Sequence, residues 1–207
     1  MLHDIEKCFP NLTKEQLENL LRLKDIYIHW NSMINVISRK DMDNFYTHHV
    51  LHSLTIAMFI DFVPGTSVLD VGTGGGFPGI PLAILFPESE FTLLDSTEKK
   101  IKVVAAVKNE LNLTNIIPLA KRIENEKSRY HFVISRAVMK FPELVKTTRK
   151  NIHTGSVNKI PNGIICLKGG DLTEELAPFA GKVKTYGINT FCDNSFFETK
   201  KIVYLPV

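Results

Sequence analysis

The chain has 207 residues, 44% of them hydrophobic, and a formal net charge of +3, which suits a soluble protein with one core or one domain plus an appendage. No run approaches the ~18–20 apolar residues that a membrane-spanning helix needs, and the first residues do not resemble a signal peptide. The three cysteines, Cys8, Cys166 and Cys192, form no CxxC pair. We therefore expect a cytoplasmic protein with neither a metal site nor a disulfide framework.

The N-terminal part of the chain predicts helices. Residues 12–30 begin with a capping box, Thr13 with Gln16, and carry apolar side chains near the 3.6-residue helical period. A polar break over 31–43 separates them from a second helical segment, 44–62. We expect a helical extension at the N-terminus, over residues 1–64.

From residue 65 onward, short apolar runs alternate with segments of helical spacing. The predicted strands lie at 67–71, 90–94, 115–119, 132–135, 163–167, 183–190 and 201–205, and the predicted helices at 78–86, 96–111 and 142–151. This alternation is typical of an α/β domain with a doubly wound, mostly parallel sheet, here seven-stranded and built from residues 65–207. The last two strands are separated by too short a segment for a crossover helix, so we expect an antiparallel hairpin at the sheet edge.

The most informative segment follows the first predicted strand and leads into a helix. It reads Asp70-Val71-Gly72-Thr73-Gly74-Gly75-Gly76-Phe77-Pro78-Gly79. Ligands of open α/β sheets bind beyond the carboxyl ends of the strands, where glycines let the backbone come close. Residues 74–79 satisfy the GxGxxG pattern of dinucleotide sites. That match has little specificity in so glycine-dense a stretch, and Pro78 lacks an amide that should hold the pyrophosphate.

An alternative pattern begins at an acid, Asp70-x-Gly72-x-Gly74-x-Gly76. A carboxylate at the strand end suits a positively charged ligand without phosphate, such as S-adenosylmethionine, and we favour this interpretation over nucleotide binding or a purely structural turn. Asp95 ends the second predicted strand, near the offset of about 20 residues at which an acid accepts ribose hydroxyls. Both cofactors contain that ribose, so Asp95 does not choose between them. Its other interpretation is the N-cap of the next helix.

At these residues the sequence resembles the bacterial ribosomal RNA small subunit methyltransferase G family, also called glucose-inhibited division protein B. The resemblance covers about residues 35–168 and rests on the segments 70–82, Leu93-Leu94-Asp95-Ser96, Ser135-Arg136-Ala137 and Leu167-Lys168-Gly169. It implies a Rossmann-like class I methyltransferase fold. It also implies an enzyme, expected to be a monomer, that methylates N7 of a guanine in 16S ribosomal RNA with S-adenosylmethionine, its partner being that RNA or the small ribosomal subunit.

Carried onto matching positions, the resemblance implies specific cofactor contacts. Together with the glycine pattern it assigns them to Gly72, Gly74, Phe77, Asp95, Ile123, Glu124 and Arg136. The residues alone leave Glu124 as surface charge, and they leave Arg136 open between a ligand contact and an internal salt bridge. Because guanine N7 carries no proton to remove, no catalytic acid or base is assigned.

The sequence departs from the family in the second N-terminal helix. The family usually has Arg-His-x-x-Asp-Ser there, whereas this chain reads His48-His49-Val50-Leu51-His52-Ser53. His48 and His52 therefore replace an arginine and an aspartate and share a helix face. No third ligand accompanies them, so we expect no metal site.

Basic residues occur in clusters, namely Lys99, Lys100 and Lys102, then Lys121 and Arg122, then Lys146, Arg149 and Lys150. Solvated helix faces are the ordinary explanation, but the first five would line one rim of the site if the substrate is RNA. Three other functions stay open at this point. They are methylation of a small molecule or protein, nicotinamide-dependent oxidoreduction, and non-catalytic RNA binding on a methyltransferase fold.

Overall fold

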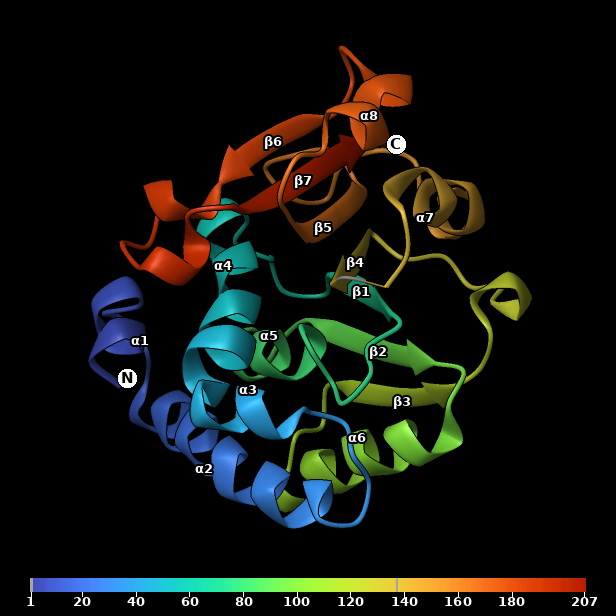
Figure 1. The fold of residues 1–207 in the computed structure, drawn as a ribbon. Helices are drawn as coiled ribbons and strands as arrows, with labels where there is room; N and C mark the ends of the chain where they lie inside the picture. Colours follow the sequence, from blue (N-terminus) through green and yellow to red (C-terminus); the bar gives the residue numbers. More distant parts are fainter. Residues whose placement is uncertain (1, 137) are drawn as a thin grey trace.

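One seven-stranded sheet forms the centre of the molecule (Figure 1). The structure is a computed structural model that describes residues 2–136 and 138–207, without the side chains of residues 2–4 and 39. Met1 and Ala137, the last residue of the Ser-Arg-Ala motif, lie outside the described residues.

The strand order is β3-β2-β1-β4-β5-β7-β6. The strands are β1 (Ser67–Val71), β2 (Glu90–Asp95), β3 (Ile116–Ala120), β4 (Phe132–Arg136), β5 (Gly163–Gly169), β6 (Lys184–Gly187) and β7 (Lys200–Pro206). The first five strands are parallel, and β7 runs antiparallel to both β5 and β6. The order reverses between β1 and β4, which is where open α/β sheets bind ligands. The predicted doubly wound, mostly parallel sheet is confirmed.

The C-terminal hairpin lies at the sheet edge, as predicted, but its second strand is the inner one. Residues 202–205 of β7 are buried, and β7 pairs with β5 on one side and β6 on the other. Strand β6 is shorter than the predicted 183–190 because residues 188–190 form a 3₁₀ turn. A short, partly exposed strand carrying Lys184 suits an edge, since it offers little unpaired backbone to another chain.

Helices cover both faces of the sheet and fill the N-terminal part. They are α1 (Leu2–Cys8), α2 (Lys14–Asn31), α3 (Arg39–Asp43), α4 (His52–Phe59), α5 (Gly79–Leu85), α6 (Glu98–Glu110), α7 (Phe141–Thr148) and α8 (Thr173–Leu176). A π-helical segment (Tyr46–Leu51) leads into α4, and 3₁₀ turns span Ile123–Asn125, Arg149–Asn151, Ala177–Phe179, Ile188–Thr190 and Ser195–Phe197. Among the described residues, none of the helices is both long and apolar enough to cross a membrane.

The predicted N-terminal helices are present, but α1 was not predicted and the second predicted helix begins as the π-helical segment. The capping box at the start of α2 is confirmed, because Thr13 Oγ1 accepts the Gln16 amide and Gln16 Oε1 accepts the Thr13 amide. The predicted polar break contains the short helix α3, which Ser38 caps by accepting the amide of Asp41. The second predicted helix ends at Phe59 rather than at residue 62.

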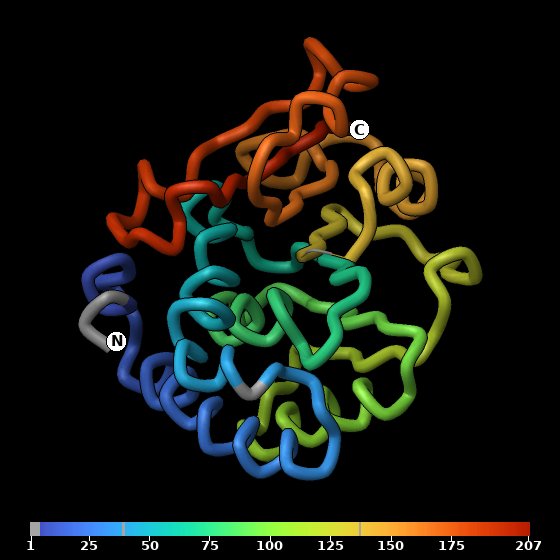
Figure 2. The backbone as a smooth tube through the Cα atoms, in the orientation of Figure 1, coloured from blue at the N-terminus to red at the C-terminus, as the bar shows by residue number. Residues whose placement is uncertain are grey.

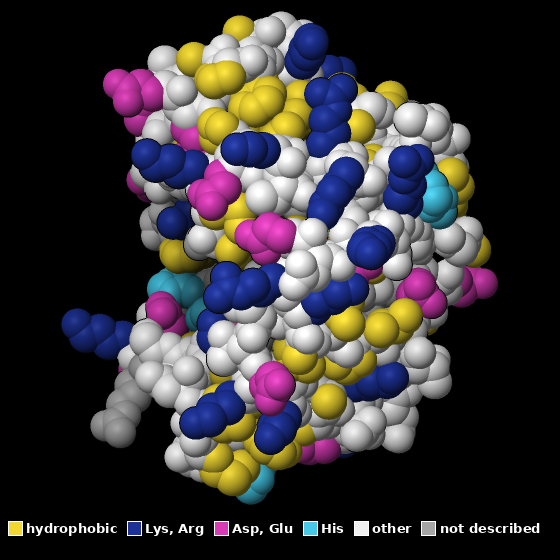
Figure 3. All heavy atoms as spheres, turned by 90° about the vertical axis from the view of Figure 1, so that its right-hand side faces the viewer, with side chains coloured by type: hydrophobic (Ala, Val, Ile, Leu, Met, Phe, Trp, Pro, Cys, Tyr) yellow, Lys and Arg dark blue, Asp and Glu magenta, His cyan; other side chains and the backbone are white. Residues whose placement is uncertain are grey.

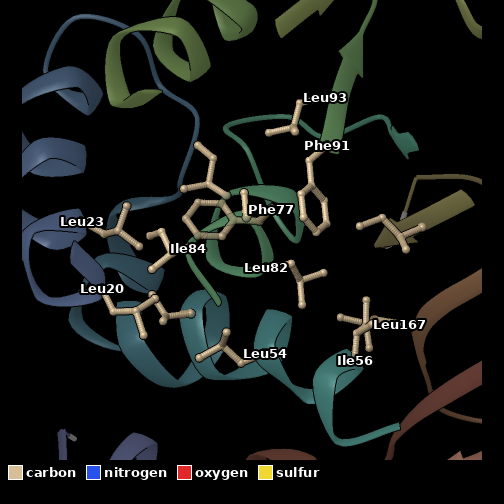
Figure 4. Close-up of a cluster of buried hydrophobic side chains, with 14 of the residues drawn as sticks. Leu20, Leu23, Leu54, Ile56, Phe77, Leu82, Ile84, Phe91, Leu93 and Leu167 are labelled. Atoms are coloured by element: carbon tan, nitrogen blue, oxygen red, sulfur yellow. The ribbon is translucent and has the colours of Figure 1, made fainter. Parts of the chain in front are cut away.

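The N-terminal helices and one face of the sheet share a single hydrophobic core. Leu20 and Leu23 of α2 lie with Leu54 of α4, Ile84 of α5 and Phe91 of β2 in one cluster of buried side chains (Figure 4). The opposite face of the sheet packs mainly against α7 and α8 in a smaller cluster. The division into residues 1–64 and 65–207 stays a prediction, but the apolar contacts run continuously across it.

The two ends of the chain also meet. Figure 2 shows the N-terminal segment beside the C-terminal segment near residue 190, and there the Sγ atoms of Cys8 and Cys192 lie 2.8 Å apart. The two sulfurs are not joined in a disulfide bond, and Cys192 is buried. The two residues, distant in the sequence, are therefore neighbours in the fold.

Candidate functional site

The loop between β1 and α5 follows a main-chain path that requires glycine. Gly72, Gly74 and Gly76 have φ values of +66°, +59° and +105°, in the left-handed region that other residues rarely adopt. At Gly72 there is also no space for a side chain, because a Cβ there would lie 2.5 Å from Cγ2 of Val138. The glycines thus allow both the turn itself and the close approach of the segment that follows β4.

Asp70, near the end of β1, holds this loop through hydrogen bonds. Its side chain is fully buried, and Oδ2 accepts hydrogen bonds from the Thr73 hydroxyl (2.7 Å) and the Gly79 amide (2.9 Å). Burial raises the pKa of Asp70 to about 7, although both hydrogen bonds act in the opposite direction. The sequence pattern led us to expect a carboxylate facing a positively charged ligand. The structure corrects that expectation, because Asp70 is directed into its own loop.

Asp95, at the end of β2, also forms a hydrogen bond with this loop. Its Oδ2 accepts the Gly74 amide (3.0 Å), and its Oδ1 accepts the Thr97 amide (2.9 Å). The N-cap position of α6 belongs to Thr97, so Asp95 is not the N-cap residue of that helix. Lys100 Nζ lies 3.8 Å from Oδ2. Asp95 therefore connects the glycine loop to the start of α6 and still borders the cavity next to them.

A cavity of about 310 Å³ opens at the carboxyl ends of β1, β2 and β3. Four predicted cofactor contacts line it, namely Gly72, Asp95, Ile123 and Glu124. The volume is at the lower end of the range of about 300–1,000 Å³ that small-molecule sites have. A nearly buried carboxylate that can accept ribose hydroxyls, beside apolar side chains that can contact a purine, fits an adenosyl group.

The other three predicted contacts are not part of the cavity lining, and two of them belong to the loop itself. Gly74 donates its amide to Asp95. Phe77 is buried among aromatic rings, and its ring centroid lies 5.3 Å from Cζ of Arg136. The Arg136 guanidinium donates to the carbonyl of His48 (2.9 Å), and Nη2 lies 3.0 Å from Nδ1 of His49. Phe77 and Arg136 thus contact the π-helical segment, and the role of all three residues toward a cofactor stays a prediction.

The buried arginine determines the state of the neighbouring histidine. Burial, and next the charge of Arg136, lower the pKa of His49 to about 4, so the imidazole is neutral near pH 7. Because Arg136 can only donate, Nδ1 of His49 is the acceptor. Burial also lowers the pKa of Arg136, to about 10, which leaves its charge intact.

His48 and His52, the two residues that differ from the family pattern, pack against a segment near the C-terminus. The His48 ring stacks on Phe196 with centroids 4.0 Å apart, and the His52 ring meets Phe196 at 5.5 Å. His48 Nδ1 also lies 3.1 Å from Oδ1 of Asp41. The two histidines share a face, as expected, and that face is covered by an aromatic side chain.

Several residues of the cavity lining were not predicted as site residues, and two of them come from the segment after β4. Val138 and Met139 line the cavity and follow β4 closely. Lys168, at the end of β5, donates to the carbonyl of Met139 (2.6 Å) and to Glu175 Oε1 (2.7 Å), which ties this segment to α8. Their position after the Ser-Arg-Ala motif, at the carboxyl end of a parallel strand, was the only signal available.

The basic residues divide into two groups. Lys100, Lys121 and Arg122 line the cavity, whereas Lys99 and Lys102 are exposed on α6 outside the lining. Figure 3 shows Lys and Arg side chains spread over the face that forms the right-hand side of Figure 1. Three of the five basic residues predicted to form a rim of the site therefore line the cavity, and the other two do not.

Comparison with known proteins relates this site to one family. A family profile described as GidB, rRNA small subunit methyltransferase G, matches residues 16–196. Ribosomal RNA small subunit methyltransferase G of Bacteroides fragilis is 53% identical over 201 residues, covering 97% of this chain and 98% of that protein. The protein of the same name from Bacteroides thetaiotaomicron is 54% identical over 203 residues, covering 98% of each. A solved S-adenosylmethionine-dependent methyltransferase from Aquifex aeolicus shares the fold, with a TM-score of 0.55, 16% identity and coverage of 83% of this chain and 100% of that one.

The buried carboxyl group predicts a specific pH dependence of stability. Between about pH 4 and pH 7 the folded protein retains a proton on Asp70 that the unfolded chain, with a pKa near 3.8, has released. The contribution of Asp70 to the free energy of unfolding therefore falls as pH rises through this interval, by up to about 1.4 kcal/mol per pH unit. Asp70→Asn removes this titration, so the wild type should lose stability relative to the variant from about pH 4 to 7 and no further above it.

Urea denaturation of both proteins across this pH range measures the difference. Asp61→Asn, which changes an exposed aspartate, is the matched control and should run parallel to the wild type. Parallel curves for Asp70→Asn and wild type would show that Asp70 does not hold a proton in the folded state.

Proposed function

Because the chain belongs to the rRNA small subunit methyltransferase G family, we propose that it transfers a methyl group from S-adenosylmethionine to N7 of a guanine in the 16S RNA of the small ribosomal subunit. The observation that carries the proposal is the match to full-length relatives over nearly the whole chain. The cavity beside the glycine loop supports it, because an acidic residue, a close backbone approach and apolar walls meet there. The proposed place of action is the cytoplasm, and the proposed active form is a monomer.

The proposed cofactor contacts are Gly72, Gly74, Phe77, Asp95, Ile123, Glu124 and Arg136. When bound, S-adenosylmethionine supplies an electrophilic methyl group on a positively charged sulfur. Asp95 would accept the ribose hydroxyls, and Gly72 would let the backbone approach the ligand. The buried group of Phe77, Arg136 and His49 would support the loop where it meets the π-helical segment.

The proposed chemistry asks the protein for orientation rather than for proton transfer. Guanine N7 has a lone pair in the plane of the ring and no proton to lose, so no general base is required. The site must align N7 with the methyl group and exclude water. Positive charge develops on the purine as the bond forms, and nearby carboxylate or carbonyl oxygens stabilise it. Because stacking shields the base in a helix, the guanine must be unpaired or flipped out to enter the site.

The proposed activity is tested by mapping N7-methylguanine in 16S RNA from cells with and without the gene. N7-methylation makes the guanine sensitive to reductive strand scission, so one cleavage site should disappear when the gene is deleted. It should return when the wild-type gene is restored on a plasmid. An unchanged cleavage pattern in the deletion strain would refute the proposal.

Removing the carboxylate of Asp95 should weaken the binding of S-adenosylmethionine. A hydrogen bond to a charged group is worth on the order of 1.5–3 kcal/mol, so Asp95→Ala should lower affinity roughly ten- to a hundredfold. Loss of the bond to the Gly74 amide acts in the same direction. Glu98→Ala removes an exposed carboxylate from the first turn of α6 and is the matched control. Isothermal titration with unchanged affinity in folded Asp95→Ala would exclude Asp95 from the site.

The basic residues of the cavity should make RNA binding sensitive to salt. Each phosphate contact with single-stranded RNA contributes about −0.7 to the slope of log affinity against log salt concentration. The double variant Lys100→Gln with Arg122→Gln should therefore flatten the slope by about 0.7 for each phosphate that its side chains no longer neutralise.

The pair Lys99→Gln with Lys102→Gln removes the same charge from the exposed part of α6 and shows whether the RNA path extends over that helix. Filter-binding titrations at several salt concentrations give both slopes. A slope equal to that of the wild type in the Lys100 and Arg122 variant would mean that the cavity rim does not contact RNA.

A further inference from the structure

The hydroxyl of Tyr27, in helix α2, donates a buried hydrogen bond to the main-chain carbonyl of Gly75 in the glycine loop. We propose that Tyr27 is a positioning residue for methyl transfer, which holds the glycine loop in the conformation that binds S-adenosylmethionine. The inference rests on the proposed function, because it concerns the same cofactor site. It adds that a residue of the N-terminal helices, outside the sheet domain, determines how well that site binds.

The loop is restrained partly by its own residues, since the Thr73 hydroxyl donates to Asp70 and the Thr73 carbonyl accepts the amides of Gly76 and Phe77. Its glycines make it depend on neighbouring side chains as well. Glycine has the largest conformational freedom of any residue and loses the most on becoming ordered. Two side chains of the sheet domain hold amides of the loop region, with Asp95 accepting from Gly74 and Asp70 accepting from Gly79. The carbonyl of Gly75, which lies between these two points in the sequence, accepts the hydroxyl of Tyr27.

Tyr27 also packs against the loop. Its ring lies close to Gly75, where a Cβ, if one were added, would come within 3.5 Å of Cε1 of Tyr27. At Gly76 an added Cβ would be 3.1 Å from the Tyr27 hydroxyl. The ring is fully buried, with centroids 5.4 Å from Phe45 and 5.0 Å from Phe77. A displacement of this ring would therefore displace the loop.

The helix that carries Tyr27 is fixed to the sheet domain at a second point. Arg22 donates to the carbonyl of Glu110 (2.8 Å), and the Trp30 indole N–H donates to the Glu110 carboxylate (2.9 Å). Glu110 ends α6, the helix that begins just after Asp95. Burial raises the pKa of Tyr27 well above its usual value, so its hydroxyl stays a donor throughout the physiological range. The hydroxyl thus meets Gly75 from a helix that also contacts the sheet domain at the end of α6.

The chain contains a matched pair of tyrosines for the test. Tyr46 also lies in the N-terminal part, and its hydroxyl also donates to a main-chain carbonyl, that of Leu21 (2.8 Å), but that carbonyl belongs to α2. Tyr27→Phe and Tyr46→Phe each remove one oxygen atom and one hydroxyl–carbonyl bond. Tyr46 is only partly buried, whereas Tyr27 is fully buried, so thermal unfolding of both variants measures how much stability each loses.

The test compares the affinity for S-adenosylmethionine of the wild type and of both full-length variants by isothermal titration. Tyr27→Phe should weaken binding roughly tenfold, because a buried carbonyl loses its partner and the loop its restraint. Tyr46→Phe should stay within about twofold of the wild type. In steady-state methylation, Tyr27→Phe should raise KM for S-adenosylmethionine with kcat nearly unchanged at saturation. Hydrogen exchange at the amides of residues 74–77 without cofactor should be faster in Tyr27→Phe only.

The outcomes separate this inference from the proposed function. If the wild type binds S-adenosylmethionine and Tyr27→Phe binds it as tightly, with unchanged loop exchange, then Tyr27 does not position the loop and the inference is wrong, while the proposed function stands. The inference is equally wrong if Tyr27→Phe lowers kcat at unchanged affinity. If the wild type itself neither binds S-adenosylmethionine nor transfers its methyl group, the proposed function fails and the inference with it.

Discussion

The left-handed main chain of the loop between β1 and α5 is the constraint on which the rest of the site depends. At Gly72, Gly74 and Gly76 only glycine follows this path without strain, so these positions carry no side chains that could hold the loop. Much of the restraint must then come from neighbouring elements. Asp70 supplies it from β1, Asp95 from β2 and Tyr27 from α2, each through a main-chain group of the loop region. The arrangement explains why two strand ends and a helix from the N-terminal part converge on one short segment.

Asp70 and Arg136 are ionisable groups buried next to this loop, and burial disfavours their charged forms. Neighbouring groups offset part of this free-energy cost. Asp70 has one carboxylate oxygen without a hydrogen-bond partner among the described residues, and burial raises its pKa. The charge of Arg136 acts in the opposite direction and favours the ionised carboxylate. Arg136 is itself held by the carbonyl of His48 and the neutral ring of His49. The π-helical segment thus supplies hydrogen-bond acceptors for the buried charge of Arg136, which belongs to the sheet. The N-terminal part and the sheet are therefore connected by these polar contacts as well as by their common hydrophobic core.

The predicted site residues illustrate how far reasoning from the sequence reaches. The parallel-strand pattern placed Asp95 at the ligand edge because the carboxyl ends of parallel strands lie together, and Asp95 does line the cavity with Gly72. The same reasoning could not tell a carboxylate facing a ligand from one facing its own loop, so Asp70 was misinterpreted. Whether a carboxylate at the end of a strand faces the ligand cavity or its own loop depends on side-chain packing. Packing of this kind produces no periodic pattern of residues that could be recognised in the sequence.

Local patterns by themselves determined the seven strands, the longer helices, the capping box of α2 and the glycine loop, because each depends on neighbours within a few residues. They also indicated the antiparallel hairpin. Resemblance in the loop also indicated the family. Contacts between distant segments were decided only in the folded protein. Tyr27 reaches Gly75, Phe196 covers His48, and Cys8 lies beside Cys192. The sequence by itself determined most of the helices and strands, because their patterns are local. Which side chains of α2 and of the C-terminal segment reach the site was decided only by the packing of these segments in the tertiary structure.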